Sequence, residues 1–168
     1  MLGKIVFFMG RSASGKSTIS NLLSKELNKN KFYCVVVDAD ELAKYKLLPQ
    51  FGDYSLKARL ERAPYLVKIL KWLQSQFDYV IVAASGQPKG VREIFKKELT
   101  NCTTIYLSAS LELCKSRDNK GVYEMKDVPG LDLPYDEPLD CNYVLEVDNL
   151  TPTMIIKNLK KIILKDIF

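Results

Sequence analysis

The stretch "KIVFFMGRSASGKST", residues 4–18, decides the fold. A short apolar run at 4–9 is typical of a buried strand. It is followed by G-x-x-x-x-G-K-S at 10–17 and then by a helical pattern. Glycines at both ends of such a loop let backbone amides turn inward around phosphate groups, and the next helix adds the positive end of its dipole. The spacing therefore predicts a nucleoside triphosphate-binding loop.

Within this loop, Lys16 is expected to reach the β and γ phosphates, and the Ser17 hydroxyl is expected to bind Mg²⁺. The chain has no N-K-x-D guanine motif, so ATP is the expected phosphate donor. The predicted ATP-binding residues of the loop are Gly10, Arg11, Ser12, Ala13, Ser14, Gly15, Lys16, Ser17 and Thr18.

Apolar runs alternate with helical patterns along the rest of the chain. Further strands are expected at 32–38, 79–85, 103–109 and 143–147, and helices at 17–29, 55–76, 90–99, 111–117 and 151–167. Strands that are apolar on both faces and alternate with helices predict a parallel sheet covered on both sides. The expected fold is therefore α/β, of the P-loop NTPase class: one domain, 1–168, with a five-stranded parallel sheet flanked by helices.

Prolines refine three of these expectations. Pro64 is expected to kink or break the long helix at 55–76. Thr151 is expected to cap the closing helix, with Pro152 at its first position. The segment 118–142 holds three prolines and two glycines and lacks clear periodicity. A loop of this length inside a compact domain is usually functional, which predicts a lid over about 116–141.

The second strand ends in a pair of carboxylates, in "VVVDADEL" at 35–42. Ligands of such sheets bind outside the carboxyl ends of the strands, and this is the edge where Asp38 and Asp40 are expected. One of them could accept a proton from an acceptor hydroxyl while the other orders Mg²⁺ through water. Alternatively, Asp40 only caps a helix beginning near Glu41.

Composition narrows the chemistry further. The chain has 168 residues, 47% of them hydrophobic, and no apolar run close to the ~20 residues of a membrane span. There is no histidine, and the four cysteines have no metal-site spacing, which argues against zinc and for a reducing, cytoplasmic setting. The net charge of +5 comes from lysines spread along the chain. Solvated helix faces explain it better than nucleic-acid binding, and a phosphate-rich substrate also suits it.

Four segments together resemble the adenylylsulfate (APS) kinase family. They are the phosphate loop at 10–18, "YSLKARLER" at 54–62, "LCKSRDNKGVY" at 113–123 and "PGLDLPYDEP" at 129–138. Enzymes of this family phosphorylate the 3′-hydroxyl of adenosine 5′-phosphosulfate with MgATP. The resemblance covers nearly the whole chain and implies a P-loop kinase with ATP and Mg²⁺, commonly a homodimer.

Roles follow from the matching positions. Asp40 would be the base that takes the 3′-hydroxyl proton, and Asp38, with Ser17, would order the metal. Arg117 would act in the lid over ATP. Lys16 would act with the two aspartates in catalysis. The residues expected to bind the acceptor are Asp40, Tyr54, Arg59, Arg62, Ser85 and Lys126, although core packing is an equal interpretation of Tyr54.

Departures from the family pattern gather on the acceptor side. "DADELA" replaces D-G-D-N-x-R, "AASGQPKG" stands where F-I-S-P-x-R is usual, and the aromatic residue that stacks on adenine has no counterpart, Val128 being nearest. Loss of a stacking partner removes about 1–3 kcal/mol of base affinity, by analogy with nucleic-acid bases. A related 5′-activated nucleotide is therefore an alternative acceptor, for example a cytidine diphosphate derivative such as cytidine diphosphoramidate.

Two other functions stay open from the residues alone. One is a kinase for a non-nucleotide alcohol, which nucleoside 5′-derivatives would not stimulate. The other is a regulatory nucleotide-binding protein that has lost catalysis, against which the intact loop and aspartate pair argue. No nucleic-acid or membrane partner is expected.

Overall fold

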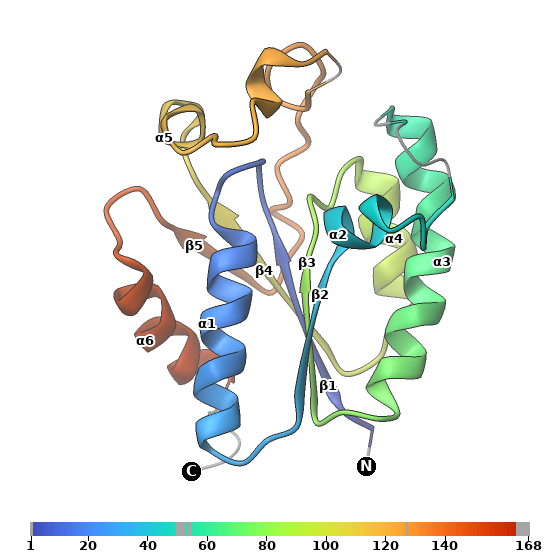
Figure 1. Cartoon of the computed structure of the whole chain (residues 1–168), viewed down its shortest axis with the longest axis vertical. Coiled ribbons are helices and arrows are strands. Elements are labelled where there is room, and N and C mark those ends of the chain that lie inside the picture. Colours follow the sequence, from blue (N-terminus) through green and yellow to red (C-terminus); the bar gives the residue numbers. More distant parts are fainter. Residues whose placement is uncertain (1, 50–52, 54, 127, 164–168) are drawn as a thin grey trace.

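The computed structural model describes residues 2–49, 53, 55–126 and 128–163. Within them a five-stranded sheet lies between two layers of helix (Figure 1). Its strands are β1 (Lys4–Met9), β2 (Cys34–Asp38), β3 (Tyr79–Ala83), β4 (Cys102–Ser108) and β5 (Tyr143–Glu146). The helices are α1 (Lys16–Lys29), α2 (Ala39–Lys44), α3 (Leu56–Gln74), α4 (Lys89–Glu98), α5 (Leu111–Ser116) and α6 (Pro152–Ile163).

All strand pairs are parallel, and the order across the sheet is β2-β3-β1-β4-β5. β1 is central: Ile5 pairs with Val80 of β3 on one side and with Cys102 of β4 on the other. The predicted five-stranded parallel α/β fold is confirmed. Parallel strands all end at the same edge, so the segments that follow β1, β2 and β3 come together there.

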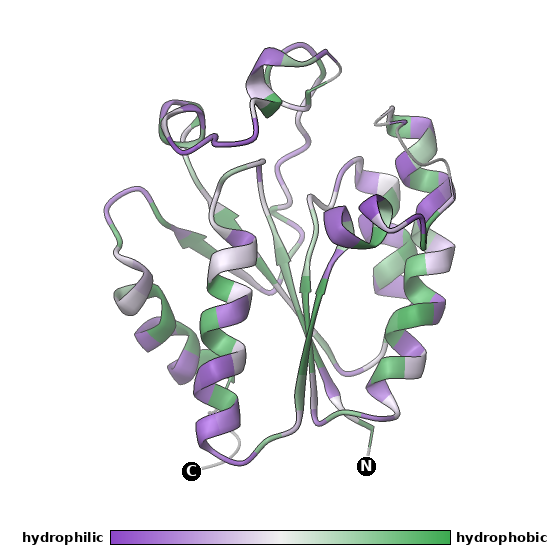
Figure 2. Ribbon diagram, viewed as in Figure 1, coloured by the Kyte–Doolittle hydropathy of each residue, from purple (hydrophilic) through white to green (hydrophobic). Residues whose placement is uncertain are grey.

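Each face of the sheet has its own apolar core, and the strands between them are coloured largely as hydrophobic in Figure 2. Alternate residues of β1 serve the two cores: Val6 and Phe8 pack with α1 and α6, whereas Ile5 and Phe7 pack with α3 and α4. Both helix layers bury apolar side chains against the strands, which holds the loop between β1 and α1 at the carboxyl edge of the sheet.

Two local expectations needed correction. The helix after β2 begins at Ala39, and its cap is Asp38, whose Oδ1 accepts the backbone N–H of Asp40 at 2.9 Å. The alternative in which Asp40 caps this helix is therefore wrong. Of the kink or break expected at Pro64, the break is wrong, because Pro64 lies inside α3, which runs on to Gln74 as one helix.

At the other end of the chain, the expected cap of the closing helix is confirmed. Thr151 Oγ1 accepts the backbone N–H of Met154 at 3.3 Å, and Pro152 is the first residue of α6. The expected continuation of this helix from 164 to 167 falls outside the described residues.

The expected lid segment lies above the carboxyl edge of the sheet (Figure 1). A 3-10 turn, η1 (Val122–Glu124), and a bridge between Pro129 and Leu133 interrupt an otherwise irregular course. None of the helices within the described residues combines the length and the apolar character that a membrane crossing demands.

Candidate active site

The phosphate loop connects β1 to α1 through backbone that glycine alone adopts without strain. Gly10 has φ +153°, and a Cβ at this position would lie 2.8 Å from the carbonyl oxygen of Leu107. Gly15 has φ +101° and caps α1. The left-handed geometry at both ends turns the loop over the N-terminus of α1, where a helix binds anions best.

Lys16 lies inside this loop. Its Nζ donates to the carbonyl oxygens of Gly10 at 3.0 Å and Arg11 at 2.6 Å. Burial lowers the pKa of Lys16, while Asp40 first and then Asp38 oppose that shift. Both carboxylates thus act electrostatically on Lys16.

Asp38 connects the aspartate pair to α1 through Ser17. Its Oδ2 accepts a hydrogen bond of 2.5 Å from the Ser17 hydroxyl, while its other oxygen caps α2. Ser17 lies in the first turn of α1, and Asp38 is the last residue of β2. The helix and the strand together therefore place these oxygens side by side. Asp40, the second residue of α2, is exposed beside them and interacts electrostatically with Lys16.

The acceptor residues predicted from sequence are only partly brought together. Arg59, on α3, donates from Nη1 to Ser85 Oγ at 3.0 Å, which links α3 to the turn after β3. Arg62, one turn further along α3, donates from Nε to the Pro49 carbonyl oxygen at 2.9 Å and from Nη2 to that of Asp53. Its guanidinium therefore braces the chain before α3, in addition to any role towards a ligand.

The lid residues differ in how they reach the loop. Tyr123 donates from its hydroxyl to the Ser12 carbonyl oxygen at 2.9 Å. Lys120 lies near enough to Lys16 to lower its pKa. Arg117, at the end of α5, and Lys126 are exposed, and no contact within the described residues joins either of them to the aspartates.

The structure describes one of the two remaining acceptor-side positions. Tyr54 falls outside the described residues. Val128 is buried, and its carbonyl oxygen accepts the backbone N–H groups of Leu131 and Leu133 at 3.0 and 3.2 Å. Val128 is thus a turn residue at the start of the second half of the lid, the segment 128–136.

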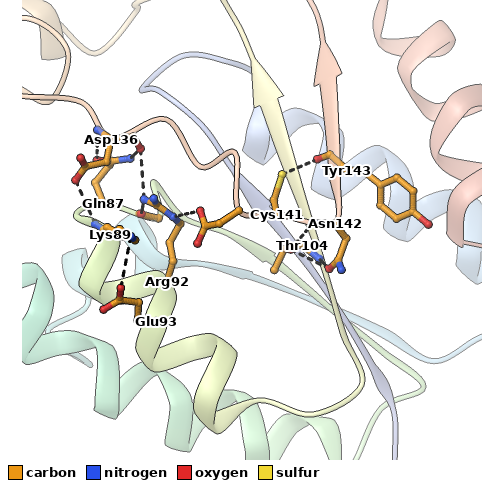
Figure 3. A network of polar contacts seen from close by, with 11 residues as sticks. Gln87, Lys89, Arg92, Glu93, Thr104, Asp136, Cys141, Asn142 and Tyr143 are labelled. Atoms are coloured by element: carbon orange, nitrogen blue, oxygen red, sulfur yellow. Dashed lines mark hydrogen bonds and ion pairs between the residues drawn. The ribbon is translucent and has the colours of Figure 1, made fainter.

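Sequence reasoning missed the polar network that anchors this segment (Figure 3). Gln87, buried after β3, exchanges hydrogen bonds with the backbone of Asp136, at 2.5 Å to its oxygen and 3.1 Å from its nitrogen. Arg92, buried on α4, donates to the Gly86 carbonyl oxygen at 2.9 Å and to Asp140 Oδ1 at 2.8 Å. Gln87 belongs to "AASGQPKG", whose departure from the family pattern was the available signal, whereas Arg92 lies in the helix that follows it and had no such signal.

Fold, loop and aspartate pair together define a P-loop kinase. More narrowly, the chain belongs to the adenylylsulphate kinase family, whose model matches residues 2–146. An adenylyl-sulfate kinase from Thermodesulfovibrio yellowstonii is 30% identical over 159 residues, covering 88% of this chain and 77% of that protein. The protein is thus a phosphotransferase of the adenylyl-sulfate kinase type, acting on an alcohol group.

Solved structures agree on the fold. The APS kinase of Mycobacterium tuberculosis in complex with AMPPNP and APS is 23% identical, with a TM-score of 0.81 over 94% of this chain and 95% of that one. A shikimate kinase from Acinetobacter baumannii in complex with shikimate is 16% identical, with a TM-score of 0.67 over 99% and 96% of the two chains. The same fold therefore serves more than one acceptor.

Proposed function

We propose that the protein transfers the γ-phosphate of ATP to the ribose 3′-hydroxyl of a 5′-activated nucleotide. The observation that carries the proposal is the grouping of Lys16, Asp40 and Asp38 at the carboxyl edge of β1 and β2. A partly buried lysine at the phosphates and a carboxylate at the hydroxyl are the two groups that in-line phosphoryl transfer requires.

Each residue of this group has a distinct task. The loop amides and Lys16 hold the β and γ phosphates and spread the charge that develops during transfer. Asp40 accepts the proton of the attacking hydroxyl, since one Asp38 oxygen is already engaged with Ser17 and the other with the helix cap. With no histidine in the chain, this task falls to a carboxylate.

Magnesium fits the oxygen atoms present here. The Ser17 hydroxyl and the Asp38 carboxylate form one pair beside the loop, and Mg²⁺ binds through one or two such groups while keeping phosphate and water ligands. We propose that these two residues hold it, directly or through water. Bound there, the ion would neutralise charge on the phosphate oxygens.

The acceptor side supports a phosphate-bearing nucleotide. Arg59 and Ser85 are held together at 3.0 Å, and the planar guanidinium of an arginine is suited to a phosphate-containing 5′ group. We infer that Arg59, Ser85, Arg62, Tyr54 and Lys126 contribute to this side, with Arg117 covering ATP. We also propose that the protein forms a homodimer, as its resemblance to the family implies.

A second acceptor has a specific observation in its favour. Val128, the residue nearest the stacking position in sequence, is buried in a turn and presents no ring to a base. A smaller base needs less stacking surface. A cytidine diphosphate derivative such as cytidine diphosphoramidate is therefore the alternative to adenylylsulfate.

The deciding experiment is a coupled ADP-release assay over a panel of acceptors. Adenylylsulfate is compared with cytidine, uridine and guanosine 5′-derivatives and with shikimate, each at several concentrations. Saturable turnover with one or more nucleotides and none with shikimate supports the proposal. Turnover with shikimate alone, or ADP release that no acceptor stimulates, would refute it.

A further inference from the structure

Arg11 is the second residue of the phosphate loop. Its side chain points away from the loop and onto the second half of the lid, the segment 128–136. Its Cζ lies 4.1 Å from the centre of the Tyr135 ring, a cation–π distance. Its backbone carbonyl meanwhile accepts from Lys16 at 2.6 Å. One residue therefore contacts both the phosphate-binding lysine and the segment 128–136.

The fit around this side chain is tight. A Cβ added to Gly130 would lie 1.7 Å from Nη1 of Arg11, so no other residue at 130 leaves room for the guanidinium where it stands. Gly130 also has φ +89°, a conformation that favours glycine. The turn at 128–133 is thus shaped around the arginine.

The contact is expensive for the protein. Nη1 of Arg11 is buried and has no hydrogen-bond partner within the described residues. A buried donor left unpaired costs free energy, and such a group in a native structure calls for an explanation. An aliphatic side chain would fill the same space without that cost, which argues that the charge and the flat shape serve the site.

The neighbouring loop residue holds the other end of the lid. The carbonyl oxygen of Ser12 accepts from Tyr123 at 2.9 Å, before the lid turns back towards Val128. Ser12 therefore contacts the incoming part of the lid, and Arg11 contacts the outgoing part. Two consecutive residues of the loop that binds the donor therefore contact the lid, which Gln87 and Arg92 also anchor.

We propose that Arg11 is a positioning residue that seats the segment 128–136 against the phosphate loop, so that acceptor binding depends on it more than ATP binding does. The kinetic part of this inference rests on the proposed function, because it needs an acceptor. The structural part, the seating of 128–136, does not.

The test compares Arg11→Leu, Arg11→Lys and Gly130→Ala with Lys97→Leu, which makes the same change from cation to leucine at an exposed site on α4. Hydrogen–deuterium exchange is followed in peptides from 128–136 and from β1 and α1. We expect exchange in 128–136 to become about tenfold faster in Arg11→Leu and Gly130→Ala, less so in Arg11→Lys, with the other peptides unchanged. Lys97→Leu should match the wild type.

The kinetic arm uses whichever nucleotide the wild type phosphorylates. In Arg11→Leu the acceptor KM should rise about ten- to a hundredfold while the ATP KM stays within about twofold, and Arg11→Lys should recover part of the loss. If no nucleotide is phosphorylated by the wild type, the proposed function fails and the exchange data alone decide this inference. Exchange in 128–136 equal to the wild type, or faster exchange everywhere, would overturn it.

Discussion

At the scale of single residues, the division of work between Asp38 and Asp40 is the most informative feature. They stand two positions apart, yet Asp38 has both oxygens engaged, with Ser17 and with the α2 cap, while Asp40 faces the electrostatic field of Lys16. Geometry therefore favours Asp40 as the proton acceptor and Asp38 as the organiser of the loop edge.

Replacement of Asp40 tests this division. Asp40→Asn keeps the size of the side chain and removes the base, so turnover should fall about 10²–10⁴-fold while ATP binding stays near that of the wild type. Turnover is measured by ADP release, and ATP binding by titration calorimetry. The exposed neighbour Glu41→Gln serves as the control, and an Asp40→Asn enzyme as fast as that control would contradict the assignment.

The pH dependence of Lys16 gives a second prediction at this scale. Burial holds the pKa of Lys16 below its ordinary value of 10.5, so its ammonium is lost earlier on the alkaline side than a free lysine's. Between the lowered pKa and 10.5 the unfolded chain binds more protons than the folded one, so this group's contribution to stability rises with pH in that window.

Activity should change in the opposite direction across the same window. The kcat/KM for ATP should fall as pH rises through the lowered pKa, because the loop loses its cation. Lys16→Arg, which stays protonated, should be slower but should lack this alkaline fall. A fall of the same shape in both proteins would show that another group causes it.

At the scale of elements, Pro64 shows where a local rule yields to packing. Proline has no N–H to donate to the Leu60 carbonyl, yet α3 continues through it because Ala63, Leu66, Val67 and Leu70 bury the other face of the helix. Burial of the apolar face of α3 therefore outweighs the tendency of proline to end a helix. The expected break therefore gave way to one continuous helix.

This gives a stability prediction. Pro64 is exposed, so Pro64→Ala restores the missing helical hydrogen bond without disturbing the core and should stabilise the fold by about 1–3 kcal/mol. Urea unfolding at equilibrium measures the change. Lys68→Ala, exposed on the same helix, should stay within about 0.5 kcal/mol of the wild type. A destabilised Pro64→Ala protein would mean that α3 is shaped around its proline.

Periodicity was enough to predict all five strands and most helices, because buried strands and amphipathic helices leave a pattern in neighbouring residues. It missed the early start of α2, since six residues are too few to show a helical period and Asp40, not Asp38, was considered as the cap. The phosphate loop was predictable because its geometry is local. The contacts of Arg11 with Tyr135, of Gln87 with Asp136, and of Arg92 with Asp136 and Asp140 were not, because these partners lie 44 or more residues away in sequence.

At the scale of the whole molecule, the return of the chain from the lid to β5 depends on one buried arginine. Arg92 joins α4 to Asp136 and Asp140 and to the turn after β3 (Figure 3). Its side chain is 6% exposed, whereas that of Asp140 is 37% exposed, so the ion pair itself is partly screened. Arg92 therefore stabilises the structure mainly by donating hydrogen bonds to the carbonyl oxygens of Gly86 and Asp136.

Removal of this anchor should loosen the acceptor side and the fold together. Arg92→Ala leaves the Gly86 carbonyl without its donor and should destabilise the protein by about 1–3 kcal/mol. Lys96→Ala, exposed one turn further along the same helix, is the control and should change little. Equal urea midpoints for the two variants would show that the network contributes nothing to stability.

The central place of β1 has a consequence for how the chain is made. β1 is synthesised first, but its partners begin at residues 79 and 102, and no strand made earlier can pair with it. At about 5–20 residues per second, an apolar segment with two phenylalanines waits roughly 4–15 s before β3 has emerged. Chaperone binding during synthesis should therefore concentrate on the first strand, and a mutation that slows the middle of the chain should lower yield without altering the finished protein.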